Sequence, residues 1–221
     1  MREGFNIKEF IEKYDTDKSE QYLAMYDQFF SKFKTDKINL LELGVYKGGS
    51  LLLWRDYFVN GRIAGIDVNP VTIDDSSDRV NFYQGKQEDI DFLKMVALKE
   101  TGSKGFDIII DDASHIAFLT KTSFLYLFKS HLNERGIYAI EDWGTGYWPS
   151  WPDGRKYTGK NHPYGMVGFI KELIDECGMA DINKGLSKSY NCYSSLIESI
   201  HISHGLCIVI KKASEDSENA R

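Results

Sequence analysis

The sequence predicts an α/β protein with a Rossmann-like sheet of seven mostly parallel strands, a terminal antiparallel hairpin and helices on both faces. Short apolar runs of strand length alternate with helical stretches through the middle of the chain, which is typical of a parallel sheet. The last two runs, 196–202 and 206–211, are separated only by Ser203, His204 and Gly205, which is too short for a parallel crossover. With 221 residues and 42% hydrophobic content, the chain can bury one substantial core.

The individual elements follow from these patterns. The five remaining strands are predicted at 38–45, 62–67, 80–84, 106–111 and 136–141. Helices are predicted at 50–59, 88–101, 118–132 and 163–177, whereas 69–79 is polar, contains Pro70 and is weakly helical at best.

Two helices are expected ahead of the sheet, and they define the domain organisation. Ile7, Phe10, Ile11 and Tyr14 share one helical face, and a stronger aromatic stripe runs from Tyr22 to Phe33. We therefore predict N-terminal helices packed on the core over 1–35, a Rossmann-like domain over 36–212 and a disordered polar tail over 213–221. The stripe is expected in the core or at a homodimer contact.

Composition excludes several function classes. The net charge of −6 and the absence of a basic run argue against nucleic-acid binding. No window approaches the ~20 apolar residues of a membrane span, and no export signal is evident. The three cysteines lack the spacing of a disulfide framework or a zinc site, so we expect a cytoplasmic protein.

A glycine turn follows the first strand and is the clearest sign of a ligand. Gly44, Gly48 and Gly49 lie between an apolar strand and a helix that Ser50 can cap, so backbone N–H groups can face a bound molecule. Asp67 ends the second strand, where its carboxylate can accept hydrogen bonds from a ribose diol. NAD and S-adenosylmethionine both contain this ribose, but Tyr46 replaces the second glycine of the dinucleotide fingerprint and disfavours NAD. The alternative is a tight turn without a ligand.

Carboxylates gather at the ends of two later strands. Asp111 and Asp112 end one strand and Glu141 and Asp142 end the next, so all four are expected at one edge of the sheet. An all-oxygen set suits Mg²⁺, and we predict Asp112, Glu141 and Asp142 as its ligands. His115, three residues after Asp112, can act as general base on a metal-bound hydroxyl. The alternative is that the aspartates cap a helix and His115 is a surface residue.

These motifs resemble a known family. Asp111-Asp112-x-Ser114-His115 and Ile140-Glu141-Asp142-Trp143-x-Thr145-x-Tyr147-Trp148 are similar to segments of the macrocin and mycinamicin type of antibiotic-sugar O-methyltransferase, which has the class I S-adenosylmethionine-dependent methyltransferase fold. The resemblance implies Mg²⁺ on Asp112, Glu141 and Asp142, with Asp112 and His115 as catalytic residues. The cofactor-binding residues then expected are Glu42, Gly44, Tyr46, Gly48, Gly49, Ser50, Asp67, Gln87, Glu88 and Asp111, with Asp111 beneath the sulfonium and Gln87 and Glu88 near the adenine. Tyr14 to Lys18 resembles a Gly-Thr-Asp-Lys element of the family, with Asp15 in place of the glycine, and no role is assigned to it.

The loop 143–162 follows the acidic edge directly and is predicted to be a lid over the acceptor. It contains Trp143, Tyr147, Trp148, Trp151 and Tyr157, which can pack on a sugar, and Arg155 and Lys156, which can meet an anionic substituent. The sequence as a whole therefore predicts an S-adenosylmethionine-dependent, Mg²⁺-assisted O-methyltransferase acting on a sugar hydroxyl of a glycoside or saccharide. A catechol-type O-methyltransferase of a phenol, an NAD-binding oxidoreductase and a non-catalytic binding module remain alternatives.

Overall fold

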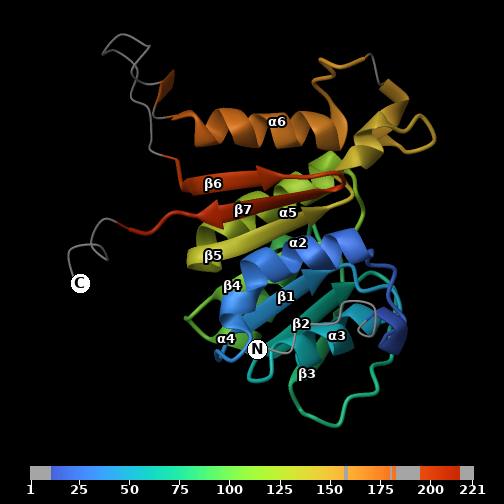
Figure 1. Cartoon of the computed structure of the whole chain (residues 1–221), viewed down its shortest axis with the longest axis vertical. Coiled ribbons are helices and arrows are strands. Elements are labelled where there is room, and N and C mark those ends of the chain that lie inside the picture. The colour runs from blue at the N-terminus through green and yellow to red at the C-terminus, as the bar shows by residue number, and fades with distance from the viewer. Residues whose placement is uncertain (1–10, 157–158, 180, 183–194, 215–221) are drawn as a thin grey trace, which may run out of the picture.

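The fold is built on one seven-stranded sheet. The structure, a computed structural model, describes residues 11–156, 159–179, 181–182 and 195–214. Its seven strands are ordered β3-β2-β1-β4-β5-β7-β6 (Figure 1). Their bounds are Asn39–Leu43 for β1, Arg62–Asp67 for β2, Val80–Gln84 for β3, Phe106–Asp111 for β4, Leu132–Glu141 for β5, Ile197–Ile202 for β6 and Leu206–Lys211 for β7.

The predicted fold class is confirmed. Strands β1 to β5 pair in parallel, and β7 runs antiparallel to both β5 and β6. One boundary was wrong: β5 begins at Leu132, where the sequence pattern predicts helix, and its pairing with β4 shifts register between Phe106 and Ile108. Arg135 lies in this irregular stretch with φ 59°, which interrupts the strand pattern that sequence reading depends on.

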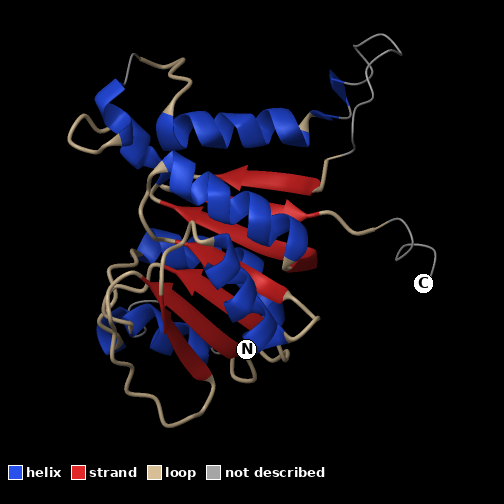
Figure 2. Ribbon diagram, turned by 180° about the vertical axis from the view of Figure 1, so that it is seen from behind, coloured by secondary structure: helices blue, strands red, loops and turns tan. Residues whose placement is uncertain are grey.

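Helices cover both faces of the sheet. On one face lie α2 (Glu20–Phe30), continued by the 3₁₀ turn η1 (Ser31–Phe33), and α3 (Gly49–Tyr57); α2 crosses the face turned to the viewer in Figure 1. On the other face lie α4 (Ile90–Thr101), α5 (Ala117–Ser130) and α6 (Gly165–Cys177), seen from behind in Figure 2. Residues 69–79 form no helix, as expected. Of the described helices, none combines the length and apolar character that crossing a membrane requires.

The aromatic stripe of α2 lies in the core. Tyr26 and Phe30 are buried, and their rings lie 4.8 Å apart, with the Trp54 ring 5.2 Å from Tyr26. The stripe therefore closes one face of the sheet, and a homodimer stays a prediction. Of the first predicted helix, residues 11–13 are helical and the preceding residues lie outside the described part, as does 215–221 of the predicted tail.

Candidate active site

A cavity of 680 Å³ opens at the carboxyl ends of the parallel strands, where open α/β sheets bind ligands. It is lined by six of the ten predicted cofactor residues: Gly44, Tyr46, Ser50, Asp67, Gln87 and Glu88. The same cavity is lined by Asp112, His115 and Asp142. The structure thus brings the predicted nucleoside-binding turn and the predicted reaction chemistry to one space.

The glycine turn is held close to the end of β4. Gly44 has φ 81°, and a Cβ built on it would lie 2.5 Å from Ala113 Cα and 2.6 Å from the Asp112 carbonyl carbon, both backbone atoms. Gly48, with φ 86°, meets the Ile73 side chain, and Gly49 meets the backbone of Asp15. Neither of the latter two lines the cavity. The glycines here allow three segments of chain to approach one another, with only Gly44 at the cavity wall.

Two acids beside the turn have different roles. Asp67 Oδ2 accepts hydrogen bonds from the N–H groups of Val45 (3.0 Å) and Tyr46 (3.1 Å), which fixes the turn to the end of β2. Glu42 accepts the Ser50 hydroxyl at 2.7 Å and is buried behind the turn. The prediction that Ser50 caps α3 was wrong, because the cap position is Gly48 and the Ser50 hydroxyl turns to Glu42 instead.

Strand alternation separates Asp111 from Asp112. Asp111 faces the α5 side of the sheet, where Ser123 (2.8 Å), Tyr138 (3.1 Å) and Gln87 Nε2 (3.1 Å) donate hydrogen bonds to it. Burial raises the pKa of Asp111 to about 6. Asp111 does not line the cavity; it holds Gln87, whose Oε1 in turn accepts the Ser114 N–H at 3.0 Å. Direct contact of Asp111 with a cofactor stays a prediction.

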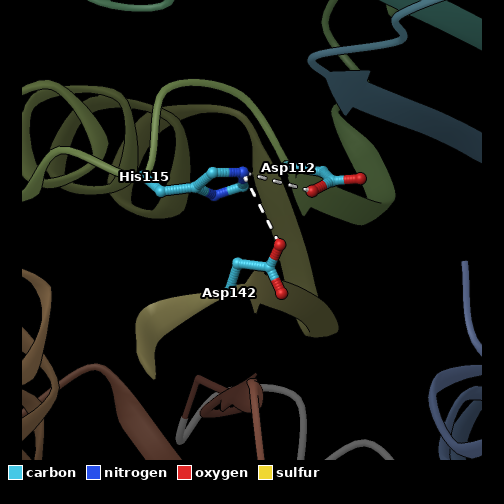
Figure 3. A group of neighbouring side chains, drawn as sticks. All are labelled: Asp112, His115 and Asp142. Carbon is cyan, nitrogen blue, oxygen red and sulfur yellow. Dashed lines mark ion pairs between the residues drawn. The ribbon is translucent and has the colours of Figure 1, made fainter. Parts of the chain in front are cut away.

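Asp112, His115 and Asp142 point toward one another (Figure 3). His115 Nε2 lies 3.8 Å from Asp112 Oδ1 and 3.8 Å from Asp142 Oδ2. No helix joins Asp112 to His115, because α5 begins only at Ala117, and His115 reaches this place through a left-handed backbone with φ 51°. Its carbonyl oxygen accepts the Trp151 indole N–H at 3.2 Å and the Thr145 hydroxyl at 3.4 Å.

Backbone strain is concentrated around this cavity. Of the five non-glycine residues with positive φ in the described chain, three line it: Tyr46 (47°), His115 (51°) and Asp142 (51°). Such conformations cost on the order of 1–3 kcal/mol each and cluster at functional sites.

Lys18, which the sequence left without a role, contacts the acidic edge of the sheet. Its ammonium lies 3.0 Å from Glu42 Oε1, 2.9 Å from Asp112 Oδ2 and 2.5 Å from Glu141 Oε1. Burial opposes its charge, but these carboxylates outweigh burial and raise the pKa of Lys18 well above its usual value. Burial and the neighbouring Asp112 raise the pKa of Glu141. The signal was the resemblance of Tyr14 to Lys18 to a family element, but nothing in the sequence linked it to the distant acids.

Two tyrosines of α2 were also missed. The Tyr22 hydroxyl donates to Asp142 Oδ1 at 2.6 Å, and the Tyr26 hydroxyl donates to Glu141 Oε1 at 2.7 Å. Burial, followed by these acids, raises the pKa of both phenols, so both remain donors at neutral pH. The four-residue spacing of Tyr22 and Tyr26 is the pattern that could have pointed to a shared face of α2.

The predicted metal ligands fall into two overlapping groups. Ligand atoms of Asp112, His115 and Asp142 all lie within 4.8 Å of one another, as do those of Glu42, Asp112 and Glu141. Glu141 does not line the cavity, and its role as a ligand stays a prediction. The carboxylate oxygens that face the cavity are the donors that Mg²⁺ prefers, so this site fits the ion.

The predicted lid is docked on the helices beside the cavity. It contains the 3₁₀ turns η2 (Trp143–Tyr147) and η3 (Asp153–Lys156), and Asp153 Oδ2 accepts the Ala117 N–H at the start of α5 at 2.7 Å. None of the described residues of 143–162, including Arg155 and Lys156, lines the cavity, and Tyr157 lies outside the described part. Closure over an acceptor stays a prediction.

The strand order, the glycine turn and the acid at the end of β2 define a class I methyltransferase fold. The comparisons support this class. The structure resembles that of the MycE methyltransferase of the mycinamycin pathway, solved in complex with Mg and SAH, with a TM-score of 0.78 and 30% sequence identity. The match covers 96% of this chain and 56% of the MycE chain. A putative caffeoyl-CoA O-methyltransferase from Staphylococcus aureus shares the fold alone, with a TM-score of 0.53 and 15% identity.

Sequence relatives of known function narrow the class of methyltransferase further than the fold does. The chain is 33% identical to mycinamicin VI 2''-O-methyltransferase of Micromonospora griseorubida over 86% of its own length and 48% of that protein. It is 30% identical to demethylmacrocin O-methyltransferase of Streptomyces fradiae, over 84% of its own length and 47% of that protein. The chain is thus a homologue of the mycinamicin and macrocin type of sugar O-methyltransferase, and the predicted resemblance is confirmed. It spans about half the length of these relatives. A search of protein-family models found no match.

Proposed function

We propose that this protein is an S-adenosylmethionine-dependent, Mg²⁺-assisted O-methyltransferase that acts on a sugar hydroxyl of a glycoside or saccharide. The observation that carries the proposal is the single cavity shared by the glycine turn with Asp67 and by Asp112, His115 and Asp142. Relatives named for methylating mycinamicin VI and rhamnosyl tetracenomycin support the acceptor class. Solved structures of MycE with Mg and SAH support the two cofactors.

Residues around β1, β2 and β3 would hold the methyl donor. Gly44 and Tyr46 line the cavity, Asp67 could accept hydrogen bonds from the ribose hydroxyls, and Gln87 and Glu88, which line the same cavity, would approach the adenine. Four further predicted residues, Glu42, Gly48, Gly49 and Asp111, lie behind this wall and would support it.

Asp112 and Asp142 would hold Mg²⁺ from the cavity side, with Glu141 as the third predicted ligand. When bound, the ion supplies a lowered pKa for a coordinated sugar hydroxyl. His115 Nε2 would take the proton of that hydroxyl, and the carboxylates of Asp112 and Asp142, each 3.8 Å away, would stabilise the resulting imidazolium. The loop 143–162 would exclude water once an acceptor is bound.

The same proposal includes a cytoplasmic homodimer without nucleic-acid or membrane partners. The spacing of the three cysteines, which matches no disulfide framework, supports a reducing compartment. The boundaries 1–35, 36–212 and 213–221 are kept as the domain proposal. Sedimentation or light scattering would test the dimer.

Binding and transfer assays test the function. Calorimetry should detect binding of S-adenosylhomocysteine and not of NAD. The protein should transfer the labelled methyl group of S-adenosylmethionine to methyl α-L-rhamnoside and not to catechol. Removal of the metal by EDTA should abolish this transfer. Asp112→Asn and His115→Ala should each lower kcat by at least about 10²-fold, whereas the exposed His201→Ala should not. NAD binding, or transfer to catechol alone, would refute the proposal.

A further inference from the structure

We propose that Tyr22 and Tyr26 of α2 are positioning residues of the metal site, each fixing the rotation of one carboxylate. This inference rests on the proposed function. It assigns to the helix ahead of the methyltransferase sheet a part in metal binding, separate from its packing on the core.

The backbone at the end of β5 makes this arrangement possible. Side chains of consecutive strand residues point to opposite faces, so Glu141 and Asp142 should diverge. Asp142 has φ 51° and ψ 32°, which breaks the alternation and turns its carboxylate back toward α2. Both carboxylates therefore meet hydroxyl groups that lie one helical turn apart.

The hydrogen bond to Asp142 selects one of its two oxygens. Tyr22 donates to Oδ1 at 2.6 Å, and the other oxygen, Oδ2, is the one directed at His115. A carboxylate held by one oxygen keeps the second oxygen aimed into the cavity, which is the orientation that a ligand needs. Partners of this kind are typically worth 10–100-fold in metal affinity.

The Tyr22 phenol is itself fixed by the turn between β6 and β7. Gly205 lies there with φ 77°, and a Cβ built on it would collide with the Tyr22 hydroxyl and lie 2.8 Å from Cζ. The hydroxyl of Ser203, two residues before Gly205, donates to Met25 Sδ at 2.9 Å, one turn along α2 from Tyr22. The turn therefore leaves the phenol little freedom to move away from Asp142.

Glu141 differs from Asp142 because a second donor holds the same oxygen. Lys18 Nζ and the Tyr26 hydroxyl both contact Glu141 Oε1, at 2.5 Å and 2.7 Å. Loss of the Tyr26 hydroxyl leaves the lysine in place. The geometry thus predicts an order of effects, with Tyr22 more important than Tyr26.

The test measures Mn²⁺ binding by electron paramagnetic resonance in the presence of S-adenosylhomocysteine. Mn²⁺ is used because it accepts the same oxygen ligands as Mg²⁺. Tyr22→Phe should weaken Mn²⁺ binding by about 10–100-fold and Tyr26→Phe by less, while the Kd for S-adenosylhomocysteine changes by less than about twofold. Tyr57→Phe is the matched control, since its hydroxyl donates to the remote Asp27 at 2.7 Å, and it should bind Mn²⁺ as the wild type does. Gly205→Ala should reproduce the Tyr22→Phe loss with the phenol still present.

The outcomes separate this inference from the proposed function. Unchanged Mn²⁺ affinity in both Tyr22→Phe and Gly205→Ala would overturn the positioning role while the metal site survives. An equal loss in Tyr57→Phe would also overturn it, because general loosening would then explain the effect. If the wild type binds S-adenosylhomocysteine but no Mn²⁺, the metal-dependent function fails first and the inference fails with it.

Discussion

Replacing Gly44 by alanine should separate the end of β1 from the end of β4. The residue has φ 81°, and its neighbours across the gap are backbone atoms of Asp112 and Ala113 that no side-chain rotation can remove. The added methyl group would lie 2.5 Å from Ala113 Cα, against the 3.4 Å at which ordinary contacts begin, so the two segments must separate by roughly 1 Å.

The energetic cost has two parts. Holding alanine at positive φ costs about 1–2 kcal/mol, and overpacking a tight contact costs about 1–3 kcal/mol more. A stiffer unfolded chain offsets about 0.4–1 kcal/mol. We therefore expect Gly44→Ala to lower the free energy of unfolding by about 2–4 kcal/mol. Moving Asp112 by about 1 Å should also lower kcat by roughly 10²-fold.

Gly102→Ala provides the control, because Gly102 has φ 61° and nothing within 4 Å of a built Cβ. It should show the conformational cost of a methyl group at positive φ, here with ψ −117°, without a steric clash. Urea unfolding gives the free energy of unfolding of each variant. Calorimetry gives the Kd for S-adenosylhomocysteine, which shows whether the cofactor-binding side of the cavity is intact. If Gly44→Ala lowers the free energy of unfolding by less than about 2 kcal/mol and binds S-adenosylhomocysteine as the wild type does, the close approach of the two strands does not constrain the site.

Two further predictions concern the supports of the cavity. Burial raises the pKa of Asp111 to about 6, above its unfolded value of about 3.9. The contribution of Asp111 to the free energy of unfolding is therefore full below about pH 4. It is lost as the pH rises to about 6, at on the order of 1 kcal/mol per pH unit. Asp111→Asn should remove this dependence in urea unfolding at pH 4.5 and 7, and an identical pH dependence in both proteins would contradict the assignment. Trp151→Phe removes the indole donor to the His115 carbonyl while keeping a ring there. It should lower kcat about tenfold without changing the Kd for S-adenosylhomocysteine, and an unchanged kcat would argue against His115 positioning by the loop.

Local patterns predicted the fold and half of the site. Apolar runs of strand length and the three glycines place Gly44, Asp67 and Asp112 at one edge of the sheet, because the carboxyl ends of parallel strands share that edge. Alternation along β4 also explains why Asp111 is turned away from the cavity. That detail was within reach of the sequence, since adjacent strand residues face opposite sides.

The rest depended on contacts between distant parts of the chain. Lys18 lies 94 residues before Asp112 and 123 before Glu141, and no local pattern indicates which residue of the N-terminal segment returns to the acidic edge. The positive φ of His115 and Asp142 was also invisible, because neither residue type demands it. These backbone turns bring Asp112, His115 and Asp142 together where regular structure would separate them.

The strained backbone around the cavity has a consequence for engineering this protein. Tyr46, His115 and Asp142 all hold left-handed conformations that glycine adopts more easily. A library selected only for heat resistance should therefore accumulate such substitutions at these positions early, and each gain in melting temperature there would come with a loss of turnover. Thermostable variants that keep their activity should instead be sought at the amino ends of the parallel strands, which form the edge of the sheet opposite the cavity.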